Sequence, residues 1–156
     1  MVVKHRLADA SYRMYDRARH ESAFAAAAEA GTAHDFSGFQ GKRYAVLVTF
    51  RRDGTPVPTP VWFALVDDRR LVVGTDRRTA KVRRIRRNPR VRAFPSDPRG
   101  KPLGPAVDGM AQIVDGGDEA RLAEDALDRK YGRTRRVYER VMTRSEDVIH
   151  LVVVPV

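Results

Sequence analysis

The chain has 156 residues, a formal net charge of +10 and a hydrophobic fraction of 42%. This composition excludes a disordered chain, and the length fits one domain with a real core. The sequence has no cysteine, which excludes disulfides and thiolate catalysis, and its first residues lack the apolar segment of a signal peptide, so we expect a soluble, cytoplasmic protein.

The first expected element is a helix over residues 8–30, which contain no proline or glycine. The alanine run at residues 25–28 has high helix propensity, and Gly31 suits the C-cap. One helical stripe is approximated by Tyr12, Tyr15, Ala18, Ala23 and Ala26. We therefore expect a helical extension over residues 1–35, packed on the rest of the chain or on a partner subunit, and a second domain over residues 36–156.

After this extension the hydrophobic pattern changes to the alternation of β-strands. Residues 44–50 suit a buried strand, and a glycine-containing turn leads into a second strand over residues 56–66. Pro56, Pro58 and Pro60 have the same parity, so their missing N–H groups lie along one edge of that strand. We therefore expect the second strand at a sheet edge or an open seam.

The remaining chain alternates short strands with helices. Further strands are expected over residues 71–75, 91–96, 107–114 and 148–154, and helices over residues 79–88, 119–131 and 134–143. The strands total six, mostly in hairpins, with a helix inserted after the third. This order predicts a mainly β fold, a small antiparallel barrel with helical decoration.

The order of several motifs resembles a known family. Thr59-Pro60-Val61-Trp62-Phe63 is followed by Lys81-x-x-Arg84-x-x-x-Asn88-Pro89, then by Gly109-Met110-Ala111 and Lys130-Tyr131-Gly132. Together they resemble the pyridoxamine-phosphate-oxidase-like split barrels, in particular the deazaflavin (coenzyme F420)-dependent oxidoreductase branch. The resemblance covers about residues 41–154.

This resemblance implies a six-stranded split β-barrel of the FMN-binding kind and a homodimer with the cofactor in the groove between the subunits. It also implies hydride transfer between the reduced deazaflavin and an unsaturated organic substrate. Because the cofactor does the hydride chemistry, no catalytic acid–base residue is required. The four histidines are scattered without metal-ligand spacing, so we expect no metal site.

The resemblance places the cofactor phosphate near the strand at 71–75 and the helix that follows it. The N-terminus of that helix favours anions through its free N–H groups and its dipole, and Lys81 adds a positive charge. On a helical wheel Lys81 and Arg84 face the site. The arginines on the opposite side of the helix, expected in solvent, are Arg83, Arg86 and Arg87.

The segment Thr59–Phe63 is where this family lines the cofactor ring, and strand edges interrupted by proline leave backbone groups free for ring heteroatoms. The expected cofactor-binding residues are Thr49, Thr59, Pro60, Val61, Trp62, Thr75, Thr79, Lys81 and Arg84. Core packing is the alternative for Trp62, and ordinary strand composition for Thr49 and Thr75.

The deazaflavin carries an oligoglutamate tail, and the arginine-rich helix with the loop at Arg77 and Arg78 suits such an anionic chain. FMN is the alternative cofactor, because it needs a compact phosphate site. Two alternatives belong to other functional classes: a basic protein that binds nucleic acid, and a protein that binds the cofactor without turnover. Against nucleic acid, no surface aromatics are interleaved with the basic residues.

Overall fold

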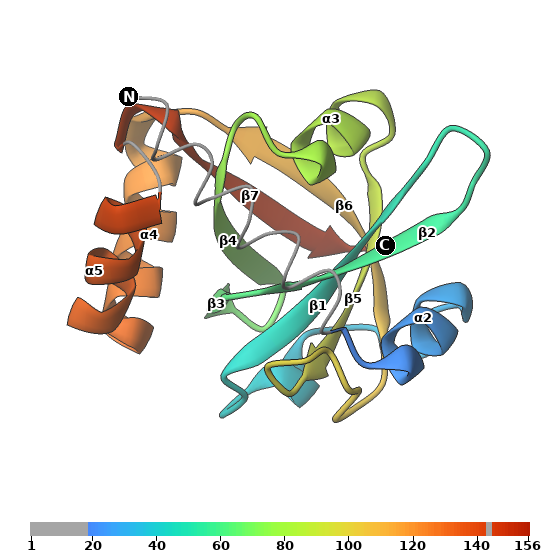
Figure 1. The fold of residues 1–156 in the computed structure, drawn as a ribbon. Coiled ribbons are helices and arrows are strands. Elements are labelled where there is room, and N and C mark those ends of the chain that lie inside the picture. The colour runs from blue at the N-terminus through green and yellow to red at the C-terminus, as the bar shows by residue number, and fades with distance from the viewer. Residues whose placement is uncertain (1–18, 143–144) are drawn as a thin grey trace.

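The computed structural model describes residues 19–142 and 145–156, which form an antiparallel β-sheet flanked by helices (Figure 1). The strands are β1 (Tyr44–Phe50), β2 (Pro56–Val61), β3 (Ala64–Asp67), β4 (Arg70–Asp76), β5 (Arg90–Ser96), β6 (Val107–Val114) and β7 (Val148–Pro155). They are ordered β2-β1-β5-β6-β7-β4-β3, and every pair of neighbours is antiparallel. The mainly β fold predicted from the sequence is confirmed.

The sheet has seven strands where the sequence predicted six. The predicted strand at 56–66 is divided at Trp62 and Phe63, which belong to neither β2 nor β3. β2 pairs with β1 and β3 pairs with β4, so the two pieces lie at opposite edges of the sheet. The edge position inferred from the prolines is therefore confirmed for β2.

The helices lie outside the sheet, with α4 and α5 on one flank and α2 on the other (Figure 1). They are α2 (Glu21–Ala28), α3 (Ala80–Arg87), α4 (Gly117–Tyr131) and α5 (Arg133–Met142), together with the short 3-10 turns η1 (Ser37–Phe39) and η2 (Ser145–Asp147). Gly132, with a φ of 60°, separates α4 from α5, as the sequence predicted.

The N-terminal helix is shorter in the described residues than the predicted span of 8–30. α2 begins after His20, whose Nδ1 accepts a hydrogen bond from the Ser22 N–H at 3.2 Å, and it ends where Glu29 returns to extended geometry. The predicted stripe residues Tyr12, Tyr15 and Ala18 lie outside the described residues, whereas Ala23 and Ala26 do pack on the sheet.

The main core fills the inside of the barrel. The inward side chains of alternate strand residues meet there, among them Leu47, Val73 and Leu151, and Phe63 joins them from the connection between β2 and β3. Ile85 of α3 also joins this core, so α3 closes one end of the barrel. Inward-facing and outward-facing residues alternate along each strand because the β pleat has a period of two residues.

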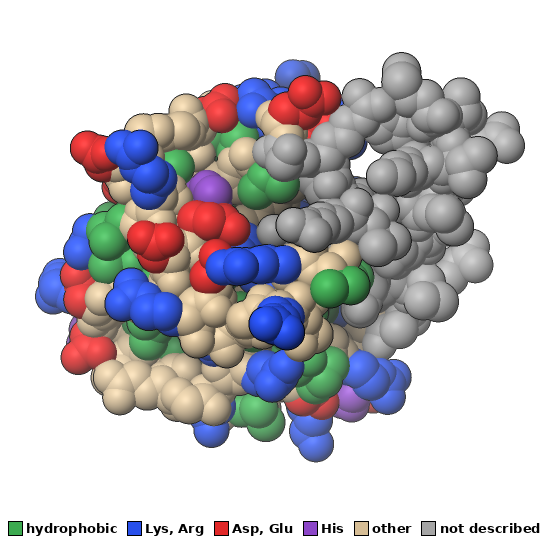
Figure 2. Space-filling model, turned by 90° about the vertical axis from the view of Figure 1, so that its left-hand side faces the viewer, with side chains coloured by type: hydrophobic (Ala, Val, Ile, Leu, Met, Phe, Trp, Pro, Cys, Tyr) green, Lys and Arg blue, Asp and Glu red, His purple; other side chains and the backbone are tan. Residues whose placement is uncertain are grey.

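Two smaller clusters cover outward faces of the sheet. Ala123 and Leu127 of α4 pack on Val72 and Val152, and Ala23 of α2 belongs to the cluster on the β1–β5 face. Figure 2 views the α4–α5 flank, where acidic and basic side chains are intermingled. None of the helices in the described ranges has the length and apolar character needed to span a membrane.

Candidate functional site

The candidate site lies where α3 joins the ends of two strands that are not neighbours in the sheet. Thr49 near the end of β1 and Thr75 near the end of β4 are both buried and point inward, as do Leu47 and Val73 two residues before them. Lys81 and Arg84, three residues apart on one face of α3, reach these two hydroxyl groups. The helix thereby bridges β4 and β1.

Lys81 is a buried ammonium group, only 7% exposed. Its Nζ donates a hydrogen bond to the Thr75 Oγ1 at 2.8 Å. Burial, together with the charge of Arg84, lowers the pKa of Lys81 to about 8, against an opposing effect of Asp76. Because burial disfavours the charged form of this ammonium group, an added anion would stabilise it.

Arg84 is half-buried, and its Nε donates to the Thr49 Oγ1 at 2.6 Å. Burial lowers the pKa of this guanidinium, and so does the positive charge of four neighbouring arginines. These four are Arg51, Arg19, Arg83 and Arg87. Among the described residues no carboxylate is paired with Arg84, so the surface beside it is strongly cationic.

The burial pattern of α3 confirms which side chains the helical wheel turned inward and which it turned outward. Lys81 is buried beside Val82 and Ile85, and Arg84 is half-buried. The side chains predicted to lie in solvent are all exposed: Arg83, Arg86 and Arg87. One face of a short, very basic helix is thus turned into the protein because its two apolar residues share that face with Lys81.

Thr79 occupies the N-cap of α3, as predicted, but its hydroxyl does not cap the helix. The Thr79 Oγ1 donates to the carbonyl oxygen of Asp76 at 3.0 Å, which tightens the turn between β4 and α3. The first N–H groups of α3 have no acceptor within the helix, as at any helix start. This arrangement favours an anion at the helix start.

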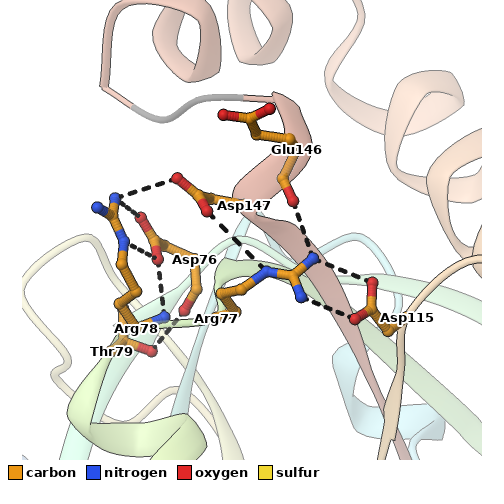
Figure 3. Close-up of polar contacts among 7 residues, drawn as sticks. All are labelled: Asp76, Arg77, Arg78, Thr79, Asp115, Glu146 and Asp147. Atoms are coloured by element: carbon orange, nitrogen blue, oxygen red, sulfur yellow. Dashed lines mark hydrogen bonds and ion pairs between the residues drawn. The ribbon is translucent and has the colours of Figure 1, made fainter.

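The two arginines of the loop before α3 are engaged in ion pairs (Figure 3). Arg77 makes a double hydrogen bond to Asp115 at 2.9 and 3.1 Å and donates to the carbonyl oxygen of Glu146 at 2.8 Å. Arg78 contacts Asp76 at 2.6 Å and Asp147 at 3.5 Å. Carboxylates of the same chain therefore hold the two side chains that the sequence suggested for an anionic tail.

Asp76 supports the loop from a buried position at the end of β4. Its carboxylate accepts hydrogen bonds from the Arg78 backbone N–H at 2.8 Å and from the Arg78 side chain. Burial acts to raise the pKa of Asp76, but the hydrogen bonds and charge of Arg78 and the charge of Lys81 outweigh it and lower the pKa. No local pattern in the sequence predicts this role of Asp76, because it depends on the folded turn.

The expected ring-lining segment is divided between two environments. Thr59 pairs with Leu47 and Val61 with Ala45, so both point to the barrel interior, and Val61 belongs to the core. Pro60 points to the opposite side, where it lies near Gly100. Two residues of the segment, Thr59 and Val61, therefore lie on the same interior face as Thr49.

Trp62 packs away from the barrel interior. Its ring stacks on Tyr131 at 5.2 Å between centroids with an interplanar angle of 19°, and it meets Tyr138 at 5.3 Å. The alternative of packing against other side chains describes this half-buried tryptophan well. In the sequence, Tyr131 was part of a family motif but was given no role in the site, and Tyr138 of α5 was not singled out.

The comparisons with known proteins agree with this architecture. A family model described as pyridoxamine 5′-phosphate oxidase matches residues 32–154, and the chain belongs to this family. A search of curated proteins finds no match.

Solved structures include several similar chains. A structure named F420 reductase is 25% identical over 80% of this chain and 95% of that chain, with a TM-score of 0.55. General Stress Protein 26 from Bacillus anthracis str. Sterne is 27% identical over 76% of this chain and 84% of that chain, with a TM-score of 0.53. A FAD-binding protein from Mesorhizobium loti, 18% identical over 76% and 82% of the chains with a TM-score of 0.57, shares the fold.

Proposed function

We propose that this protein is an oxidoreductase that uses the deazaflavin coenzyme F420 and reduces an unsaturated organic substrate. The family match and the similar structures support a function of the flavin-type oxidoreductase kind. The observation that carries the proposal is the pair of inward-facing cations on α3, Lys81 and Arg84, each bonded to a strand hydroxyl. When bound, the deazaflavin supplies the hydride.

Lys81, Arg84 and the start of α3 are the residues we propose to hold the cofactor phosphate. Lys81 and Arg84 bond neutral hydroxyls, and a phosphate oxygen is a stronger acceptor than a hydroxyl. Thr49 and Thr75 then orient the two cations, and Thr59 and Val61 face the same interior. The role of this chain is to bind the cofactor, orient it and exclude water from it.

The preference for a deazaflavin rests on the arginines next to Arg84. Arg51 lies in the exposed turn after β1, and Arg83 and Arg87 are exposed on α3. Their positive charge extends outward from the phosphate site, where a polycarboxylate tail continues from the phosphate. FMN has no such extension, so it gains nothing from these arginines.

FMN remains the second candidate, because FMN also presents a phosphate and the family description names an oxidase. A protein that binds the cofactor without turnover is a third possibility, and the cofactor titration alone does not distinguish it from an enzyme.

We also propose a homodimer. Its support is the set of large apolar side chains left exposed on the described surface, which includes Phe24, Leu103, Val154 and Val156.

The test is a fluorescence titration of the purified protein with oxidised F420 and, separately, with FMN. Saturable binding that prefers F420 supports the proposal, and a hydride-transfer assay with unsaturated substrates then separates an enzyme from a binding protein. Preference for FMN would move the chain to the other cofactor class. Binding of neither would remove the proposed function.

Lys81→Ala is the matched test of the phosphate site. We expect the affinity for the cofactor to fall by about 1–3 kcal/mol, the cost of losing a charge-assisted hydrogen bond. Arg86→Ala is the control, because Arg86 is an exposed cation on the same helix but on its opposite face. An unchanged affinity of Lys81→Ala would exclude Lys81 from the site.

A further inference from the structure

The connection between β2 and β3 is the place where the chain crosses from one edge of the sheet to the other. β2 ends at Val61, which pairs with Ala45, and β3 begins at Ala64, which pairs with Val72. Trp62 and Phe63 lie between these ladders. Phe63 is fully buried in the barrel core, so its backbone N–H and C=O need partners other than the two ladders and water.

The hydroxyl of Tyr131, the last residue of α4, supplies these partners. It accepts a hydrogen bond from the Phe63 N–H at 2.9 Å and lies 2.7 Å from the Phe63 carbonyl oxygen. It also lies 2.7 Å from the carbonyl oxygen of Arg43, the residue before β1. One hydroxyl therefore joins the end of α4, the start of β1 and the bend between β2 and β3.

The ring of Tyr131 acts on the neighbouring side chain. It is nearly parallel to the Trp62 ring, at 19° and 5.2 Å between centroids, and Tyr138 of α5 covers Trp62 at 5.3 Å. Tyr131 thus restrains both the backbone at Phe63 and the side chain at Trp62. Burial raises the pKa of Tyr131 to about 12, so the hydroxyl keeps its proton at neutral pH.

We propose that Tyr131 is a positioning residue, whose hydroxyl fixes the bend at Phe63 and whose ring fixes Trp62, so that α4 sets the position of the segment Thr59–Trp62 along the barrel. This inference rests on the proposed function, in which that segment lines the cofactor ring. Thr59 and Val61 reach the barrel interior from β2, directly before the bend. A shift of the bend therefore moves them relative to Lys81 and Thr75.

Tyr131→Phe tests the proposal, because it removes the hydroxyl and keeps the stacking ring. We expect the affinity for F420 or FMN, measured by calorimetry, to fall by roughly 5- to 30-fold, in line with an orphaned buried backbone group. We also expect the emission of Trp62, the single tryptophan of the chain, to shift to longer wavelength without ligand. Thr134→Val, which removes an exposed hydroxyl group near the start of α5, is the control.

Hydrogen exchange of the Phe63 amide in the wild-type protein tests the contact without any variant, and so covers a variant that does not fold. We expect this amide to exchange slowly because it donates to the Tyr131 hydroxyl, although Phe63 lies outside both ladders. Exchange as fast as that of the exposed turn at Gly54 would overturn the proposal, as would wild-type affinity and emission in Tyr131→Phe. If the wild-type protein binds neither cofactor, the proposed function fails, and amide exchange and Trp62 emission still decide whether Tyr131 fixes the bend.

Discussion

Lys81 combines a cost to the folded protein with a benefit to binding. Its ammonium group is 7% exposed, and burial disfavours its charged form more than the nearby Asp76 favours it. We expect Lys81→Met to raise the melting temperature of the cofactor-free protein while it weakens cofactor binding. Thermal unfolding with and without cofactor measures both effects. A melting temperature that falls in Lys81→Met would show that Lys81 stabilises the empty site.

The lowered pKa of Lys81 predicts the pH dependence of binding. The pKa lies at about 8 in the folded protein and near 10.5 in the unfolded chain. The folded state therefore binds fewer protons than the unfolded state between these values, and the unfavourable contribution of Lys81 to stability is fully present below pH 8 and relieved as the pH rises towards 10.5.

An anionic cofactor prefers the protonated ammonium, so its affinity is expected to fall as the pH rises through about 8. Titrations at a series of pH values check this, with Lys81→Ala as the variant that loses the pH dependence. If Lys81→Ala keeps the wild-type profile, another group is responsible for it.

At the scale of elements, α5 is attached to α4 through one buried arginine. Arg135 is 1% exposed and makes paired hydrogen bonds to Glu124 at 2.8 and 3.0 Å and a third to Asp128 at 3.2 Å. Glu124 lies 2.6 Å from His150 of β7. This network fixes the helix that carries Tyr138 against the sheet.

The stability that this network contributes depends on pH through the carboxylate of Glu124. The hydrogen bond from His150, and after it those from Arg135, lower the pKa of Glu124 to about 2, although burial acts to raise it. The ordinary value is 4.5, so the stabilising contribution is present above pH 4.5 and is lost as the pH falls towards 2. We expect Glu124→Gln to be less stable than wild type at neutral pH.

Glu124→Gln should also lose less stability than wild type between pH 4.5 and 2, because glutamine does not titrate. Urea unfolding at neutral pH and at several acidic values measures this difference. The exposed Glu119→Gln on the same helix is the control. Parallel acid sensitivity in wild type and Glu124→Gln would show that other carboxylates dominate.

The elements differ in how far their sequence predicts them. The inward face of α3 follows from the spacing of Val82 and Ile85, and the edge position of β2 from its prolines, because both patterns are local. The bend at Trp62 and Phe63 was missed, since its backbone partner is Tyr131, some 68 residues away in sequence. Local periodicity does not contain such a contact.

The candidate site shows the same limit. Lys81, Arg84, Thr49 and Thr75 were named from the family resemblance and from helix geometry, and the structure brings them together in two hydrogen-bonded pairs. The ion pairs of Arg77 and Arg78 depend on acids from β4, from the loop after β6 and from η2 (Figure 3). The charges of a basic stretch are visible in sequence, but their partners are not.

At the scale of the whole molecule, the question is where the net charge of +10 is concentrated. The α4–α5 flank mixes both signs (Figure 2), and Arg77, Arg78 and Arg135 are paired with acids. Around Arg84, by contrast, four arginines act on the guanidinium, and no carboxylate in the described part of the chain is paired with it. Part of the excess positive charge therefore lies beside the proposed phosphate site, where either an oligoglutamate tail or a nucleic-acid backbone could meet it.

Replacing Arg51 and Arg83 together by glutamine separates these possibilities. Each exposed ion pair is worth about 0.2–1 kcal/mol, so the affinity for long-tailed F420 is expected to fall by roughly 2- to 30-fold. The affinity for FMN should stay unchanged, because FMN ends at its phosphate. The control replaces Arg121 and Arg129, two exposed arginines of α4, and removes the same charge from another face.

The two classes of ligand also differ in their response to salt. A tail that meets two or three arginines gives a shallow salt dependence, and F420 with a shorter tail should lose affinity even at constant salt. Nucleic acid, which engages many phosphates, gives a steep loss of affinity with salt and no dependence on the cofactor. The proposal would be contradicted if the Arg51 and Arg83 variant lost equal affinity for F420 and for FMN. It would also be contradicted if the α4 control lost as much affinity for F420 as that variant. Either result would show that the net charge attracts anions in general and that Arg51 and Arg83 do not bind the tail.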